Sequence, residues 1–521
     1  MLRGRPRSLT LMEGALDDDA RAASGRAPGR LTLYRWSDPA LLAIGLLALF
    51  AGFGQFGAVA ALGSVAKDFG HVSGGATFAD QVGLSGTILG VGLAIIRAAS
   101  FLGLPLASVA DRLGRRPMLV GTCLIGLCLT VLTVVSPSYW WFVAIFAIGR
   151  PFLSATVGLT QVGAVELTSS NQRAKAVSMV AAGYAVGAGL TAIIHSLAEH
   201  SLGFRGIFAL AVVPLVLLPV TARRVVEPDR FARERTVNAH PVLGPVAKPF
   251  RRRLIVVALL AFCVSMITGP ANSLVFIYAQ NFLHLNGIVT SVMVVVAGAT
   301  GLGGLLLGRW LADHVGRRAT VAVAMTGMAV FGTIAYTGSS WALFLGYVAG
   351  VSTGAVFAPA GGALANELFP THVRASVAGW YIGAGVAGAV CGLLAFGAVA
   401  DVGRGGDQAG MAAAVVFLPM VLATALLLLL PETRGREPEE LWGAGPATGG
   451  ASDRPAAPGT GRAPAGGEGV SAGEEVDARP DPHQDDHHAH PPAAGEQAGQ
   501  GDGGATDLPP ADPPSPGGGE H

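Results

Sequence analysis

Two arginines interrupt long apolar stretches of this chain. Arg97 precedes Asp111 by 14 residues, and Arg150 precedes Glu166 by 16 residues. At 1.5 Å per residue these separations are about 21 and 24 Å along a helix. A lipid-facing guanidinium is costly at that depth, so we predict that both arginines face an internal cavity, where a fixed cation pairs with a negative group. The alternatives are a packing role for Arg150, bonded to backbone carbonyls, and a snorkelling side chain for Arg97.

A charged turn occurs twice, 202 residues apart. Asp111-Arg112-Leu113-Gly114-Arg115-Arg116 interrupts one apolar stretch, and Asp313-His314-Val315-Gly316-Arg317-Arg318 interrupts another. Gly114 and Gly316 permit a backbone conformation that other residues adopt only at a cost. The aspartates can pair with arginines or with the positive N-terminal end of a helix. Each segment has six residues, and we call the two segments the pentads after the five positions other than Leu113 or Val315.

A second charge pattern repeats almost in step with the pentads. Glu166 precedes Arg173 by seven residues, Glu367 precedes Arg374 by seven, and the two glutamates are 201 residues apart. Two unrelated patterns with nearly the same offset predict two halves with the same internal plan.

Composition identifies the elements that must hold these charges. Apolar residues make up 51% and charged residues 13% of the 521 residues, whereas a soluble protein has roughly 25% charged residues. The chain is therefore predicted to be a membrane protein. Twelve apolar stretches approach the length of about 20 residues that spans a bilayer. They are 39–65, 82–109, 117–136, 139–165, 175–198, 205–222, 253–279, 288–312, 319–337, 341–366, 376–400 and 411–430.

Basic residues concentrate in the two terminal segments and in alternate loops. The positive-inside rule therefore predicts a multi-pass protein of the plasma or inner membrane with both termini in the cytoplasm. Residues 1–37 lack the short apolar core of a signal peptide. The four cysteines lie inside apolar segments and have no metal-ligand spacing, so we expect neither a disulfide framework nor a metal site.

The predicted organisation has five parts. They are a cytoplasmic N-terminal segment (1–38), a six-helix bundle (39–222), a cytoplasmic linker (223–252), a second six-helix bundle (253–430) and a cytoplasmic tail (431–521). Beyond about residue 442 the tail is rich in Gly, Pro and Ala, a composition typical of disorder. The run from His483 to His490 is interpreted as part of this solvated tail, with metal binding as the alternative.

With these motifs in place, the chain resembles the major facilitator superfamily over about 39–440. Three further motifs resemble most closely those of the sugar-porter and metabolite–proton symporter branch. They are Gly149-Arg150 leading to Glu166 and Arg173, Glu367 to Arg374, and Pro431 to Arg436, with Glu227 to Phe231 as a degenerate counterpart of the last. The resemblance implies an all-α membrane protein of twelve transmembrane helices in two pseudo-symmetric six-helix bundles. It also implies alternating access around a midplane site.

The resemblance further implies a cytoplasmic gate, in which charges hold the two halves together when the cavity opens outward. The gate residues would be Asp111, Arg112, Gly114, Arg115, Arg116, Glu166, Arg173, Asp313, Gly316, Arg317, Arg318, Glu367, Arg374, Glu432 and Arg434. The second pentad departs from the family pattern, because His314 replaces the usual Arg or Lys. It is therefore expected to be the weaker of the two. The alternative is that these charges only set the topology.

Symporters of this branch often carry an aspartate in the first span, and no acid occurs in 39–65. Arg150 therefore has no evident internal counter-ion. One hypothesis is that the substrate supplies the negative charge. The other is proton coupling through a different group, such as His195 or Glu199, although a buried packing role is the alternative for His195.

Other polar residues within spans are further candidates for the cavity wall. They are Gln55, Gln161, Asn272, Tyr278 and Tyr381. The sugar-porter signature of the seventh span is absent, which disfavours a hexose. The stretch from Gly183 to Gly189 has the glycines of the antiporter signature without its proline. This weakens a drug-efflux interpretation but allows close helix contact.

We therefore predict a secondary active or facilitative transporter of a small polar metabolite, with an organic anion favoured and protons as a candidate co-substrate. The alternatives are a drug or metabolite exporter and a non-transporting nutrient sensor that signals through its tail. No phosphate-binding loop or nucleotide-binding motif is present, so we expect neither an ATP-driven pump nor an enzyme. We also expect no cofactor and no nucleic-acid partner. The expected partners are the small-molecule substrate and the lipid bilayer, and the expected state is a monomer.

Overall fold

The computed structural model describes residues 34–442 apart from 36, 76, 170, 228–243, 245, 371–372, 403–407 and 437–440. The side chains of residues 174, 198–201 and 375 are also outside the description. The predictions for Glu199, for the disordered tail and for the His483–His490 run therefore lie outside the described residues.

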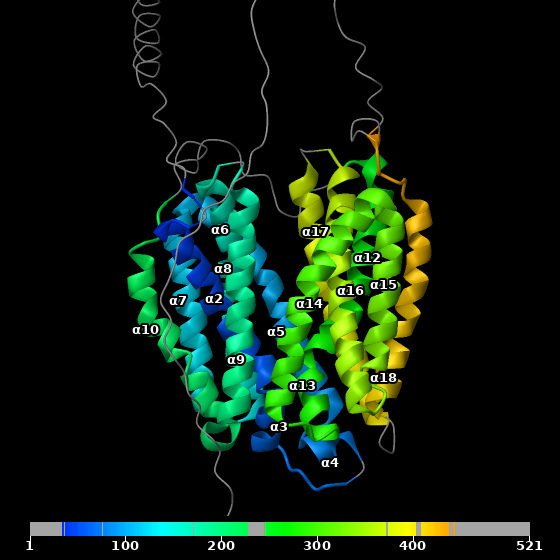
Figure 1. Cartoon of the computed structure of the whole chain (residues 1–521). Helices are drawn as coiled ribbons and strands as arrows, with labels where there is room; N and C mark the ends of the chain where they lie inside the picture. The colour runs from blue at the N-terminus through cyan, green and yellow to red at the C-terminus, as the bar shows by residue number, and fades with distance from the viewer. Residues whose placement is uncertain are drawn as a thin grey trace, which may run out of the picture. The chain divides into compact units, whose positions relative to one another are not determined.

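The first half of the chain is helical from residue 39 onward (Figure 1). Its helices are α2 (Pro39–Ala60), α3 (Leu62–Phe69), α4 (Phe78–Val82), α5 (Gly86–Ala99), α6 (Gly103–Leu113), α7 (Arg115–Leu132), α8 (Tyr139–Leu167), α9 (Arg173–Ala209) and α10 (Val212–Ala222). One 3-10 turn, Ser100–Leu102, joins α5 to α6 into a single span. Helix α9 breaks at Gly203, where φ is 57°, and therefore covers one expected span and the start of the next.

The second half repeats this succession of helices. It contains α12 (Lys248–Ser273), α13 (Val275–Ile277), α14 (Gly287–His314), α15 (Arg317–Ile334), α16 (Ser340–Glu367), α17 (Arg374–Val402) and α18 (Gln408–Phe417). A π-helical turn, Tyr278–Phe282, extends α13, and a 3-10 helix, Leu418–Leu429, continues α18.

Eleven helical segments of the described chain are long and apolar enough to span a membrane. The twelfth expected span is α15, which has 18 residues and begins with Arg317 and Arg318. Large apolar side chains point outward along the helices, with Leu306 71%, Leu422 77% and Leu428 77% exposed. Such surfaces suit a hydrocarbon solvent, in which helices satisfy their own backbone hydrogen bonds.

Glycines bring the backbones of two helix pairs into direct contact. A Cβ atom on Gly187 of α9 would overlap the carbonyl oxygen of Leu49 on α2. In the second half, a Cβ atom on Gly388 of α17 would overlap the carbonyl oxygen of Phe262 on α12. The close helix contact expected of the Gly183–Gly189 stretch is confirmed, and the same packing device recurs in both halves.

Hydrogen bonds join the two bundles at their ends opposite the pentads. Both carboxylate oxygens of Asp401 on α17 accept bonds from the first turn of α5, at 2.7 Å from Gly86 N and 2.8 Å from Thr87 N. Ser196 of α9 donates to the carbonyl oxygen of Gly287 on α14 at 2.7 Å. Figure 1 shows α3 and α4 at this end and α6 near the other.

Candidate functional site

Each pentad forms a tight turn between two helices. Gly114 and Gly316 have φ values of 111° and 125°, a region that favours glycine, as predicted. After Gly114, the Arg115 guanidinium bridges Asp111 at 2.8 Å and Glu166 at 3.0 Å. The turn is thereby tied to the end of α8 within the same bundle.

The second pentad makes the same bridge with longer distances. Arg317 lies 3.7 Å from Asp313 and 3.2 Å from Glu367. His314 stacks on Trp310, with ring centroids 4.7 Å apart. The expectation that the second copy is the weaker part of a gate between the halves stays a prediction. In the described residues both bridges lie within their own bundle, and neither joins the two halves.

A glutamate caps the helix that follows each pentad. The carboxylate of Glu227 accepts hydrogen bonds from the backbone N–H groups of Arg115 (2.6 Å) and Arg116 (2.7 Å). Glu432 accepts the equivalent bonds from Arg317 (2.9 Å) and Arg318 (3.2 Å). A carboxylate satisfies the free N–H groups of a helix N-terminus and complements its positive end. Glu227 is not among the predicted gate residues, although its place in the degenerate Glu227–Phe231 motif is a signal that could have identified it.

The remaining arginines of the predicted gate lie around these two centres. The Arg374 Nε donates to the carbonyl oxygen of Phe369 at 3.1 Å, and the Arg116 Nη2 approaches the carbonyl oxygen of Ala222 at 3.4 Å. Arg112 and Arg434 are exposed, whereas Arg173 is half-buried. Their role as a gate between the halves remains a prediction.

A cavity of about 230 Å³ lies between the two bundles and is lined by residues of α2, α5, α8, α9, α12 and α17. It brings together four of the predicted site residues: Gln55 on α2, Arg97 on α5, Arg150 on α8 and Asn272 on α12. The apolar part of the wall comes from both halves. It consists of Phe56, Ala58, Val59, Leu93, Ile96, Phe146 and Leu393. We call this space the central cavity.

The central cavity carries two cations and no acidic side chain among the described residues that line it. Arg150 donates from Nη1 to the carbonyl oxygen of Gln55 at 3.2 Å. The Nε atoms of Arg97 and Arg150 and the Nε2 atom of Gln55 are buried without a hydrogen-bond partner. Buried donors in this state favour a ligand that brings acceptors, and a carboxylate is the group that matches a guanidinium best.

Tyr184 of α9 is a wall residue that the sequence reasoning missed. Its hydroxyl donates to Gln55 Oε1 at 3.3 Å, and its side chain lines the central cavity. The tyrosine lies in the Gly183–Gly189 stretch, whose glycines predict helix packing and nothing more. No signal in the local sequence could have identified it, because only the packing of α9 against α2 brings Tyr184 to Gln55.

Other candidates lie outside the central cavity. Gln161 is exposed on α8, and Tyr381 is half-buried on α17. Tyr278 packs in the second half, where its hydroxyl accepts a 2.7 Å bond from the Gly338 N–H. His195 is fully buried on α9, with Nε2 3.0 Å from Ser64 Oγ.

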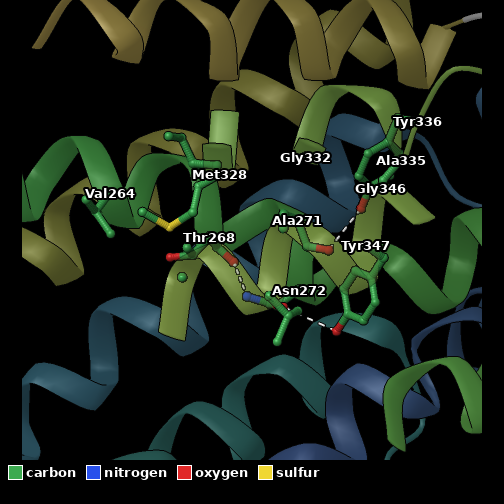
Figure 2. A pocket seen from close by; sticks show the side chains of 14 residues that line it. Val264, Thr268, Ala271, Asn272, Met328, Gly332, Ala335, Tyr336, Gly346 and Tyr347 are labelled. Atoms are coloured by element: carbon green, nitrogen blue, oxygen red, sulfur yellow. Dashed lines mark hydrogen bonds between the residues drawn. The ribbon is translucent and has the colours of Figure 1, made fainter. Parts of the chain in front are cut away.

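A second cavity, of about 260 Å³, lies inside the second half between α12, α15 and α16 (Figure 2). Thr268 and Asn272 belong to its wall and also to the wall of the central cavity. At this border the Tyr347 hydroxyl donates to Asn272 Oδ1 at 3.2 Å, and Asn272 Nδ2 donates to the Thr268 carbonyl oxygen at 2.9 Å. We call this space the side cavity.

Solved structures with the same arrangement of helices are transporters. The inward-open structure of the xylose transporter XylE from E. coli matches with a TM-score of 0.61 at 18% identity, over 77% of this chain and 98% of that one. A mutant of the nucleoside transporter NupG matches with a TM-score of 0.59 at 14% identity, over 75% of this chain and 98% of that one. At these identities the likeness concerns the fold alone.

Curated relatives are also transporters. A probable 4-methylmuconolactone transporter of Cupriavidus pinatubonensis is 25% identical over 52% of this chain, and the match spans 64% of its own length. The sialic acid transporter NanX of Escherichia coli is 24% identical over 46% of this chain and 60% of its own. The gentisate transporter of Corynebacterium glutamicum is 23% identical over 57% of this chain and 70% of its own length. The family model of the Major Facilitator Superfamily matches residues 44–311 and 289–464. The chain therefore belongs to the Major Facilitator Superfamily.

Proposed function

We propose that this protein is a secondary carrier that moves a small organic anion across the membrane by alternating access. One observation carries the proposal. Arg97 and Arg150 face a central cavity in which no described acidic side chain balances them. Two half-buried cations within the membrane spans are costly without a protein counter-ion, and a bound substrate carboxylate offsets that cost.

The names of the relatives support an anionic substrate. Gentisate and sialic acid, the cargo in the names of two relatives, are acids. The proton symporter among the similar structures supports protons as a candidate co-substrate. His195 stays a candidate for proton coupling. Its contact with Ser64 is equally the contact of a packing residue, so the anion site does not depend on it.

We further propose that the end carrying the pentads is cytoplasmic, as the arginine-rich loops indicate. The two bundles would extend over 39–222 and 253–430, both termini would be cytoplasmic, and the protein would act as a monomer in the plasma or inner membrane. The Asp401 bonds close the opposite end. In this conformation the central cavity would exchange its substrate with the cytoplasm, and the gate would form only after the halves rock together.

A thermal-shift screen of the purified full chain tests the proposal. Carboxylates should raise the melting temperature, whereas neutral sugars of similar size should not. Arg150→Ala removes charge-assisted hydrogen bonds that contribute about 1.5–3 kcal/mol, so carboxylate affinity should fall by roughly 10- to 150-fold. Arg150→Lys keeps the charge and should lose less. If carboxylates stabilise the Arg150→Ala variant as well as the parent, the anion site is wrong.

A further inference from the structure

The side cavity adjoins the central cavity on the side of the second bundle. Its border is one turn of α12, because Thr268 and Asn272 line both spaces. Four residues of helix rise about 6 Å, which is the scale of one small ring. A molecule whose carboxylate lies near Arg150 therefore has a second, separate space within reach of its other end.

Away from its border with the central cavity, the wall of the side cavity offers little to a polar ligand. Apolar side chains and glycines make most of the lining, among them Val264, Ile267 and Met328. The Tyr336 hydroxyl is committed to the Ala271 carbonyl oxygen at 3.1 Å (Figure 2). The remaining polar side chains lie close to one another and are those of Thr268, Asn272 and Tyr347. Thr268 and Asn272 form the border with the central cavity. A polar group placed deeper would lose its hydrogen bonds to water without replacement.

The volume matches a ring. An apolar cavity of roughly 150 Å³ binds benzene, and the side cavity has about 260 Å³. The thioether of Met328 and the ring of Tyr347 are groups that pack favourably against an aromatic ring. Gly350 and Gly354 of α16 keep the space open. A Cβ on either would fit without a clash, with its nearest neighbour at 3.7 Å and 3.5 Å, respectively, and would occupy part of the cavity.

We propose that the side cavity is a specificity subsite that accepts the ring of an aromatic carboxylate whose carboxylate is held at Arg97 and Arg150. This proposal rests on the proposed anion site. It assigns a binding place to the ring, the part of the substrate that the arginines do not contact. Asn272 and Tyr347 contact the substrate at the border, where a ring hydroxyl can exchange hydrogen bonds with them.

Benzoate and acetate test the subsite, because they share a carboxylate and differ in the ring. We would measure the affinity of both for the detergent-purified full chain by titrated thermal shift. The parent should bind benzoate at least about tenfold more tightly than acetate, since a buried ring adds apolar contact area that a methyl group lacks. The double variant Gly350→Ala/Gly354→Ala narrows the side cavity with ordinary van der Waals contacts. It should weaken benzoate by about fivefold or more, with acetate changed by less than about twofold.

Gly362→Ala is the matched control. It makes the same change on the same helix, has nothing within 4 Å of the added Cβ and lines neither cavity. Its affinities should equal those of the parent. The subsite is wrong if the double variant leaves benzoate unchanged, if it weakens both acids equally, or if the parent binds benzoate no more tightly than acetate. Unchanged affinities in Arg150→Ala would instead overturn the anion site itself, whatever the glycine variants do.

Discussion

Asp401 offers the sharpest test of how the two bundles close. Its carboxylate bridges from α17 to two backbone N–H groups at the N-terminus of α5, at 2.7 and 2.8 Å. The same α5 carries Arg97 eleven residues after Gly86. Asp401→Asn keeps the shape of the side chain but removes its charge and one of the two acceptors. We therefore expect the variant to favour the conformation in which this end is open.

The magnitude follows from the contacts. A hydrogen bond contributes about 0.5–1.5 kcal/mol net, and a charge at an exposed helix N-terminus adds about 0.3–1 kcal/mol. Because Asp401 is exposed and Asn retains one acceptor, the expected loss is about 1–2 kcal/mol. The ratio of open to closed molecules should therefore rise by about 5- to 30-fold.

Distance measurement between two spin labels is the assay. Val135 (69% exposed) and Trp341 (78% exposed) begin or end helices at this end of the first and second halves, and each would be replaced by a labelled cysteine. The native cysteines would first be removed, at Cys123, Cys128, Cys263 and Cys391. The Asp401→Asn variant should show a larger population of long distances.

Asp80→Asn is the matched control for this measurement. Asp80 is also a carboxylate that solvent reaches, at the same end of the molecule. Its hydrogen bonds from Ser73 and Thr77 stay within one bundle, at the start of α4. Removing its charge should leave the distance distribution of the parent. Equal distributions for Asp401→Asn and Asp80→Asn would refute the reasoning.

Two stability predictions follow from the helix contacts. Gly187→Ala places a methyl group against the Leu49 carbonyl oxygen and should lower the free energy of unfolding by about 1–3 kcal/mol. Gly189→Ala has open space around the added methyl group and should not lower the melting temperature. Equal melting temperatures for the two variants would contradict the close α2–α9 contact. Glu432→Gln weakens a helix cap and should lower the free energy of unfolding by about 0.5–2 kcal/mol. Glu227→Gln should lower it by a similar amount, and the melting temperatures of both variants measure the effect. A lowered melting temperature in only one of these two variants would contradict the predicted equivalence of the two halves.

Much of the fold could be predicted because the bilayer imposes a local rule. Each span must be a helix of sufficient apolar length, so its position can be found from the residues themselves. Helix α15 is the expected span that fits this rule least well. It has 18 residues, and the two arginines at its start belong to the pentad turn, which lowers its apolar length. Asp111 and Glu166 could also be related to Asp313 and Glu367 by their spacing alone, since a duplicated plan keeps the offsets.

The candidate site also contains residues that the sequence could predict and residues that it could not. Arg97 and Arg150 could be placed inside the molecule, because charge and depth are properties of one helix at a time. Tyr184 and Tyr347 could not, because their neighbours belong to other helices. Nothing in the local sequence says which face of α9 approaches Gln55, or that α16 turns a tyrosine toward Asn272.

The sequence by itself determined the membrane class, the duplicated plan, the charged turns and the presence of two intramembrane cations. Only the tertiary structure decided that those cations share one cavity, that the pentads pair within their own halves and that Asp401 closes the opposite end. The physical reason is that hydrophobicity and spacing act along one segment. Which side chains meet depends on the rotation and crossing of helices, and these are set by contacts such as that between Gly187 and Leu49.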